Sequence, residues 1–66
     1  MKKRNWLIEF RKEKGLSLID VAKKADVTQQ FYYYIENGER RPSPEVAQKI
    51  ADILGFNWTI FFEKKQ

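Results

Sequence analysis

Residues 17–38 of the chain read SLIDVAKKADVTQQFYYYIENG, and the polar residues of this stretch predict two short helices. Ser17 is a favourable N-cap, and the aspartate three residues later completes a weak capping box. Thr28 is a second favourable N-cap, and the Asn-Gly pair that closes the stretch is typical of a helix end. We therefore predict helices over residues 17–25 and 28–37, separated by a break of only two or three residues.

Turn residues on either side of this stretch predict three further helices. Gly15 and Gly55 are typical C-terminal stops, and Ser43-Pro44 places an N-cap before a proline at the first helical position. Asn57 can cap a last short helix that carries three aromatic residues. The additional helices are expected over residues 5–14, 43–54 and 57–62. We predict an all-α fold of five helices, in a single domain that spans residues 1–66.

The composition excludes several functional classes. The chain has 66 residues and contains no Cys and no His, so neither a disulfide nor a Cys/His zinc site is available. Its hydrophobic content of 42% supplies the apolar packing that so small a core needs. Glu9 and Glu13 are most simply a solvated helix face, because a chain this small without His or Cys is unsuited to an active-site cleft. We expect no enzymatic activity, no cofactor and no metal.

The charge pattern is suggestive of a polyanionic partner, and the hydropathy pattern gives no sign of a membrane. The net charge is +4, and residues 1–14 carry six basic and two acidic side chains. This segment indicates either contact with a polyanion or an ordinary solvated helix face. The longest apolar runs, 6–8 and 31–35, are far shorter than a membrane span. No long apolar stretch follows the basic start, so we expect no signal peptide, no membrane partner and a cytoplasmic protein.

The short break between the two central helices predicts that the second of them protrudes. A brief connection makes the helices cross steeply, and a helix exposed in this way can enter the major groove of duplex DNA. Its first turn presents Gln29 and Gln30. A glutamine amide carries a donor and an acceptor that match the N6/N7 edge of adenine. We interpret the two glutamines as base-reading residues; the alternative is that they are simply solvated.

Six short segments carry a resemblance to a known family. They are Gly15-Leu16-Ser17, Val21-Ala22, Val27-Thr28-Gln29-Gln30, Ile35-Glu36-Asn37-Gly38, Arg41-Pro42-Ser43 and Leu54-Gly55. Residues 7–62 resemble the Cro/C1-type (XRE-like) helix-turn-helix family, and the Thr-Gln-Gln opening of the third helix is similar to that of lambdoid phage repressors. The resemblance implies a five-helix lambda-repressor-like DNA-binding domain with its helix-turn-helix at about residues 17–37, a symmetric operator, and regulation of transcription by occupancy.

The resemblance also implies roles for individual residues. Bases would be read by Gln29, Gln30, Tyr33 and Tyr34, with both tyrosines on the groove-facing side of the third helix. The DNA phosphates would be held by Ser17, Thr28, Asn37, Arg40 and Arg41. Arg11 would pair with Glu36 and tie the first helix to the end of the third.

Three features depart from the family pattern. Leu18 stands where the family usually has a glutamine that supports base reading. Asp26 stands where the family usually has a glycine in the turn, so it is expected at positive φ with some strain. The groove-facing positions are usually small or polar, whereas here they are Tyr33 and Tyr34. The first and third departures bear on the operator sequence rather than on the class of ligand.

The aromatic run of the third helix has more than one interpretation. Its strand propensity is high, but the caps at both ends and the three-residue spacing of Tyr32 and Ile35 favour a helix with Tyr32 in the core. Tyr33 and Tyr34 either contact DNA or stack on each other at the surface. A stacking platform for single strands is disfavoured, because a convex helix lacks a groove that tracks the backbone.

Exposed apolar residues keep a second class of function open. Leu18 and Ile19 are expected on the exposed side of the second helix, either as chance surface hydrophobes or as contacts to the DNA backbone or a thymine methyl. Ile60 is expected on the outer face of the last helix, with the three aromatic residues of that helix inside. It marks either the seam of a dimer or a lone exposed residue. The alternative function is an antitoxin-like or other protein-interaction module with reduced or lost DNA reading.

The whole sequence predicts a sequence-specific transcriptional regulator, and specifically a repressor that binds an inverted repeat in duplex DNA as a weak homodimer. One module this small often contacts too little DNA for specific binding alone. Sixty-six residues leave no room for an effector-sensing domain, so control is expected from concentration, stability, or a separate regulatory or toxin protein. Stand-alone domains of this kind are typical of phage, plasmid and mobile-element switches, which indicates a bacterial or phage protein.

Overall fold

Four α-helices and one 3₁₀ helix make up the computed structural model, which describes residues 3–63. They are α1 (Asn5–Glu13), α2 (Leu18–Lys24), α3 (Gln29–Glu36), α4 (Pro44–Leu54) and η1 (Trp58–Phe62). Within this range no strand is formed, so the all-helical prediction is confirmed. The fifth helix, expected as an α-helix, is instead a 3₁₀ helix. Lys2 of the basic segment and the charged tail at 64–66 lie outside the described residues.

Side-chain caps begin α2, α3 and α4 where the sequence predicts them. Thr28 Oγ1 accepts a hydrogen bond from the Phe31 N–H at 3.1 Å, and Ser43 Oγ accepts one from the Val46 N–H at 3.3 Å. Ser17 begins α2 through a complete capping box. These caps satisfy backbone donors that the first helical turn leaves free, and they determine which residues occupy the first turn of α3.

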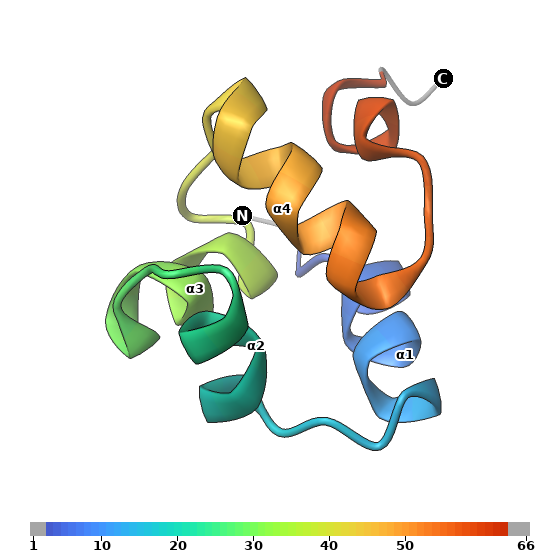
Figure 1. Ribbon diagram of the computed structural model, residues 1–66. Helices are drawn as coiled ribbons and strands as arrows, with labels where there is room; N and C mark the ends of the chain where they lie inside the picture. Colours follow the sequence, from blue (N-terminus) through green and yellow to red (C-terminus); the bar gives the residue numbers. More distant parts are fainter. Residues whose placement is uncertain (1–2, 64–66) are drawn as a thin grey trace.

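The turn between α2 and α3 centres on Asp26, whose φ is 60°. It is the one non-glycine residue with positive φ among residues 3–63, and this confirms the conformation predicted for it. The Asp26 N–H donates to the Lys23 carbonyl at 3.1 Å, and the Val27 N–H donates to the Ala22 carbonyl at 3.0 Å. The closed turn keeps α2 and α3 packed against each other, as Figure 1 shows.

All five helices contribute to one hydrophobic core. Figure 1 shows α2 and α3 on one side of the molecule, α4 in the middle, and α1 and η1 on the other side. The cluster at its centre consists of the buried residues Leu7, Val21, Ala22, Ala25, Tyr32, Ile35, Ala47, Ile50, Leu54 and Phe61. Tyr32 is fully buried, as predicted, although a tyrosine is an unusual choice for so small a core.

The 3₁₀ geometry of η1 changes which of its residues face outward. In a 3₁₀ helix successive residues are about 120° apart, compared with about 100° in an α-helix. Trp58 and Phe61 therefore share one side, and Ile60 and Phe62 flank it. Phe61 is buried, whereas Ile60, Trp58 and Phe62 are all half-buried. Trp58 and Phe62 pack against the core, as expected, although both keep some exposed surface, and Ile60, expected on the outer face, is half-buried.

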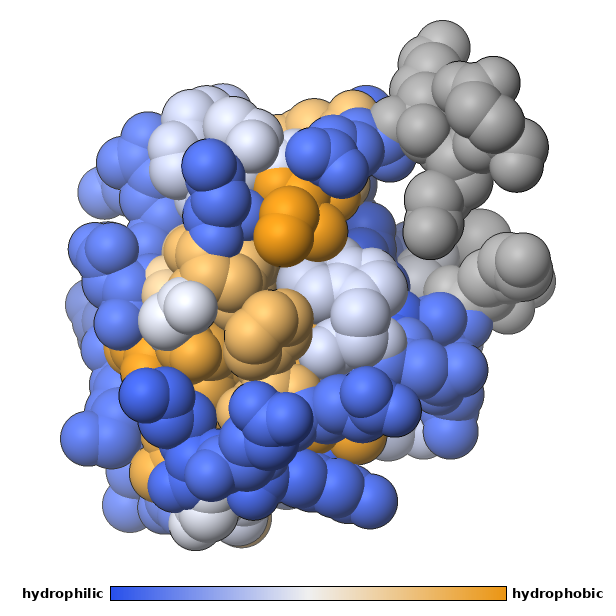
Figure 2. Space-filling view, turned by 90° about the vertical axis from the view of Figure 1, so that its right-hand side faces the viewer, coloured by the Kyte–Doolittle hydropathy of each residue, from blue (hydrophilic) through white to orange (hydrophobic). Residues whose placement is uncertain are grey.

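An apolar area ringed by polar residues occupies the side of the molecule where α1 and η1 lie (Figure 2). Aromatic rings of α1 and of the segment around η1 pack together in this region. The ring centroids of Trp6 and Phe56 are 5.3 Å apart, those of Phe10 and Phe56 5.0 Å, and those of Trp6 and Phe61 5.2 Å. This side is opposite to the side formed by α2 and α3 (Figure 1). Among the described helices, none is both long enough and apolar enough to cross a membrane.

Candidate nucleic-acid interface

The first turn of α3 lies at the surface and presents the side chains predicted to read bases. Gln29 and Gln30 are exposed in the turn that Thr28 caps. Tyr33 is 50% exposed and lies one helical turn further on, whereas Tyr34 is half-buried. Residues three and four positions apart on a helix are neighbours, so Tyr33 shares its face with both glutamines. The fold thus gathers the four residues on the first two turns of one helix.

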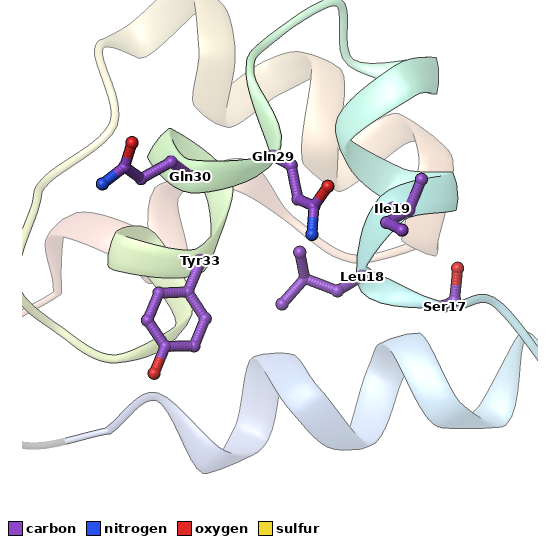
Figure 3. A pocket seen from close by; sticks show the side chains of 6 residues that line it. All are labelled: Ser17, Leu18, Ile19, Gln29, Gln30 and Tyr33. Atoms are coloured by element: carbon purple, nitrogen blue, oxygen red, sulfur yellow. The ribbon is translucent and has the colours of Figure 1, made fainter.

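A shallow groove of about 570 Å³ opens between the start of α2 and the first turn of α3. It is lined by Ser17, Leu18, Ile19, Gln29, Gln30 and Tyr33 (Figure 3). Figure 3 shows the amide of Gln29 directed toward the Leu18 side chain, whereas the side chain of Gln30 points away from α2. Four of the predicted DNA contacts therefore share this groove with Leu18 and Ile19, the apolar pair at the start of α2.

A second, smaller hollow of about 180 Å³ lies on the other side of Gln30, and Tyr34 and Arg40 help to line it. The Gln30 side-chain amide donates to the Tyr34 hydroxyl at 2.9 Å, so the two side chains form one polar unit. The ring centroids of Tyr33 and Tyr34 are 6.0 Å apart, and their planes make an angle of 52°. The two tyrosines therefore contact each other while both remain at least partly exposed.

The residues predicted to hold phosphates differ in their exposure and in whether their polar side-chain atoms already form hydrogen bonds within the protein. Arg40 and Arg41 are exposed on the loop that follows α3. Ser17 already forms two hydrogen bonds with Asp20. Its N–H donates to an Asp20 carboxylate oxygen at 2.9 Å, and its hydroxyl oxygen accepts from the Asp20 N–H at 3.1 Å. The hydrogen bond that the Ser17 N–H donates to this carboxylate lowers the pKa of Asp20. Asn37 is half-buried and donates its side-chain amide to a carbonyl of its own helix at 2.8 Å.

An ion pair ties α1 to the C-terminal end of α3. Arg11 Nε lies 2.6 Å from Glu36 Oε2, and Arg11 Nη2 lies 3.2 Å from Glu36 Oε1, so the contact is bidentate. Arg11 also donates to the Leu16 carbonyl at 3.2 Å. Glu36 is only 3% exposed, and its hydrogen bond raises the pKa of Arg11. The pair implied by the family resemblance is thus present, with its acidic partner almost fully buried.

The hydroxyl of Tyr32 is buried next to this ion pair. Burial raises the pKa of Tyr32, and the neighbouring Glu36 carboxylate raises it further, so the phenol stays neutral. Within the described part of the chain the hydroxyl oxygen has no hydrogen-bond partner. Glu36 therefore lies among an arginine, a buried phenol and the core, and this environment restrains the last turn of α3.

Arg4 also holds the end of α3, a role that the sequence did not predict. Its N–H donates to the Glu36 carbonyl at 2.8 Å, and its guanidinium donates to the carbonyls of Ile35 at 2.5 Å and Arg40 at 3.2 Å. The guanidinium also lies 5.6 Å from the ring centroid of Phe61. A cation at these carbonyls is favourable because the C-terminus of a helix carries partial negative charge.

No local sequence signal reveals this role of Arg4. The residue belongs to a basic segment that is equally typical of a solvated terminus, and the carbonyls it binds lie 31 and 36 residues away in the sequence. The groove has a clearer signal, because Leu18 and Ile19 are two adjacent apolar residues directly after an N-cap. Groups of three or more potential metal ligands are absent from residues 3–63.

Known proteins resemble this chain over most of its length. A family model described as helix-turn-helix matches residues 7–61. The uncharacterized HTH-type transcriptional regulator YqaF of Bacillus subtilis (strain 168) is 52% identical over 60 residues, which are 91% of this chain and 79% of that protein. A putative HTH-type transcriptional regulatory protein of Saccharolobus solfataricus is 38% identical over 56 residues, which are 83% of this chain but only 18% of that protein.

Solved structures share the fold as well as part of the sequence. The N-terminal DNA binding domain of SinR from Bacillus subtilis superimposes with a TM-score of 0.79 and 28% identity, covering 94% of this chain and 91% of that one. A chain of the SinR protein/SinI protein complex gives a TM-score of 0.78 and 30% identity, covering 91% of this chain and 59% of that one. The matched residues, 7–61, include the turn at Asp26, the residues that line the groove and the Arg11–Glu36 pair of this chain. The chain belongs to the Cro/C1-type helix-turn-helix family of DNA-binding transcription regulators.

Proposed function

We propose that this chain is a sequence-specific repressor that inserts α3 into the major groove of duplex DNA. The observation that carries the proposal is the exposed first turn of α3, where Gln29 and Gln30 stand at the surface beside Tyr33. The other end of the same helix is fixed by Arg4 and by the Arg11–Glu36 ion pair. A recognition helix held in this way keeps its base-reading amides in one geometry, which favours sequence-specific over nonspecific DNA binding.

The proposed contacts divide into base reading and phosphate holding. The amides of Gln29 and Gln30 fit the adenine edge, and Tyr34 orients Gln30 through its hydroxyl. Arg40 and Arg41 are the principal phosphate contacts, because their guanidinium groups are exposed. Thr28, Ser17 and Asn37 have secondary roles, since the side chain of each already forms a hydrogen bond within the protein.

The proposed regulator works as a weak homodimer on an inverted repeat, with residues 1–66 acting as one unit. A single small module covers only about 600–1,000 Å² at the DNA, so a second copy supplies the missing contact area. Repression follows from occupancy of the operator. A solved complex of SinR with SinI, which contains a chain of this fold, supports the idea that a separate partner protein controls the regulator.

A selection of bound duplexes from a random library, followed by glutamine substitutions, tests this function. Gln29→Ala and Gln30→Ala are each expected to cost about 1–3 kcal/mol on the selected duplex and to relax the preference at one position. Gln48→Ala is the matched control, because this glutamine is exposed on α4, and it should change neither affinity nor preference. Arg40→Ala and Arg41→Ala should weaken binding to all duplexes alike and flatten the salt dependence by about one unit each.

Two results would contradict the proposal in different ways. Equal losses on selected and random duplexes would remove the glutamines from the base-reading role. Failure of the unmodified protein to bind any duplex at low salt would overturn DNA binding itself and favour the protein-interaction alternative.

A further inference from the structure

The groove between α2 and α3 is more apolar than hydrogen bonding to DNA requires. Two large hydrophobic side chains are classed as exposed among the described residues: Ile19, at 46%, and Tyr33, at 50%. Both line this groove, and Leu18 lies between them (Figure 3). Apolar surface that gathers at one place on a small domain, beside polar groups, is typical of a contact site.

The glutamines that line the groove beside these apolar side chains indicate which base pair the groove would contact. Gln29 and Gln30 line the same groove, and Gln29 directs its amide toward Leu18. A leucine cannot form a hydrogen bond with this amide, so the amide remains available to a base. In the major groove an A·T pair presents adenine N6 and N7 for such an amide, and the 5-methyl group of thymine lies on the same edge. Amide and apolar groups side by side therefore match an A·T pair better than a G·C pair.

We propose that Leu18 and Ile19, together with the ring of Tyr33, form a contact surface for thymine methyl groups at the edge of the DNA site. This inference rests on the proposed DNA-binding function and adds a specificity to it. The groove is shallow and open, so it suits a flat partner such as the floor of the major groove. The helix-turn-helix then reads A·T pairs twice, by hydrogen bonds from the glutamines and by apolar contact from the start of α2.

Replacement of thymine by uracil provides a direct test, since it removes only the methyl group and preserves base pairing. On the duplex selected for the unmodified protein, each contacted thymine that is replaced should weaken binding about fourfold, the factor expected for exposing one buried carbon. Thymines outside the footprint are the control on the DNA side and should have no effect. Tyr33→Phe keeps the ring and should keep the full dependence on the methyl groups.

The protein variants identify which side chains sense the methyl group. Leu18→Gln and Ile19→Ser should bind the uracil and thymine duplexes with affinities that differ by less than about twofold, because the apolar contact is gone. Thermal melting verifies that both variants fold. Ile19 is exposed, so Ile19→Ser should melt near the unmodified protein, whereas Leu18 is half-buried and packs against the core, so Leu18→Gln should melt at a lower temperature.

The possible outcomes distinguish failure of the thymine-methyl contact from failure of the proposed DNA-binding function on which it rests. Equal affinity of the unmodified protein for thymine and uracil duplexes would overturn the methyl contact while leaving DNA binding intact. A folded Leu18→Gln variant that keeps the full dependence on the methyl groups, along with an equally unaffected Ile19→Ser variant, would also overturn it. Absence of binding to every duplex would refute the proposed function itself.

Discussion

Asp26 is the residue at which the backbone of the helix-turn-helix departs from ordinary geometry. Its φ of 60° lies in the left-handed region, which costs most L-residues roughly 1–2 kcal/mol and which aspartate tolerates better than most. We predict that Asp26→Gly leaves stability unchanged or raises it by up to about 1 kcal/mol, because glycine adopts this φ without strain. Asp26→Val should destabilise by about 1–2 kcal/mol, since a β-branched side chain is least compatible with positive φ.

Thermal melting of the glycine and valine variants tests whether the positive φ at residue 26 limits stability. Asp26→Asn provides the control, because asparagine shares the tolerance of aspartate for this conformation and should melt near the unmodified protein. A valine variant more stable than the glycine variant would show that the turn relaxes out of the left-handed region and that φ is not what limits this position.

The Arg11–Glu36 pair is asymmetric, and the asymmetry predicts which substitution costs more. The Glu36 side chain is 4% exposed, whereas the Arg11 side chain is 15% exposed and can reach water. Arg11→Met leaves a buried carboxylate without its partner, so we predict a loss of about 3 kcal/mol in the free energy of unfolding. Glu36→Gln leaves a cation that water can partly solvate and an amide that fits the same site, so its loss should be smaller, about 1–2 kcal/mol.

Urea denaturation of each variant measures these losses. The double variant is the informative control, because two partners in one contact should not lose the sum of the single effects. Marginal losses in both single variants would mean that water reaches the pair more freely than the burial of Glu36 indicates.

At the scale of elements, the starts of α2, α3, α4 and η1 were predictable because each depends on one local side chain. Ser17, Thr28 and Ser43 cap helices at the predicted positions, and Asn57 begins η1. What the sequence did not reveal depends on distant contacts. No local pattern indicates the 3₁₀ geometry of η1, which packs against α4, and nothing local to Arg4 indicates the carbonyls it binds.

In the candidate site, too, the features set by neighbouring residues in the sequence were predictable, whereas those formed by residues far apart in the sequence were not predictable from local patterns. The place of the two glutamines in the first turn of the third helix could be predicted because they directly follow the Thr28 cap. The Arg11–Glu36 pair was predictable only through the family resemblance, since its partners are 25 residues apart. The groove required the turn at Asp26 to bring the start of α2 beside the first turn of α3.

Arg4 fixes the end of α3, the proposed recognition helix, so its removal should affect both stability and DNA binding. Arg4→Met removes a cation from the C-terminal carbonyls of α3, and we predict a loss of about 1 kcal/mol in stability. Affinity for the selected duplex should fall with it, because the recognition helix loses one of its supports. Lys3→Met is the matched control: it removes the same charge from the adjacent, exposed residue and should leave the melting temperature unchanged.

Melting curves and salt titrations of DNA binding distinguish support of α3 by Arg4 from direct contact of Arg4 with a DNA phosphate. A positioning residue lowers the melting temperature and leaves the salt dependence of binding nearly unaltered. An unchanged melting temperature together with a flatter salt dependence would make Arg4 a phosphate contact instead.

At the scale of the whole molecule, two opposite sides have different surfaces. One side carries the groove and the glutamines, and the other carries the apolar area of α1 and η1 (Figure 2). The longest dimension of the described structure is 31 Å, and half-sites one helical turn apart are centred about 34–36 Å from each other. Two copies whose long axes lie in line would therefore leave about 3–5 Å between their Cα traces, a distance that only side chains can span, so any contact between them is small and forms most readily when DNA already holds both.

Ile60 is the residue through which we test such a contact. Because it is half-buried, it contributes less apolar area to a seam than a fully exposed isoleucine, and this favours a dimer that forms appreciably only on DNA. We predict that Ile60→Glu reduces the cooperativity with which an inverted repeat fills, with little effect on a single half-site. Gln48→Glu introduces the same charge on the exposed side of α4 and should leave cooperativity unchanged.

The comparison between one and two half-sites separates assembly from folding. Because Ile60 is half-buried, its replacement also lowers stability, and a loss of folded protein weakens binding to both duplexes by the same factor. A seam at Ile60 predicts a further loss that appears only on the two-site duplex, measured as the ratio of the two affinities. If that ratio is unchanged in Ile60→Glu while the unmodified protein binds cooperatively, the copies meet elsewhere, and the rest of the α1–η1 surface becomes the next place to introduce a charge.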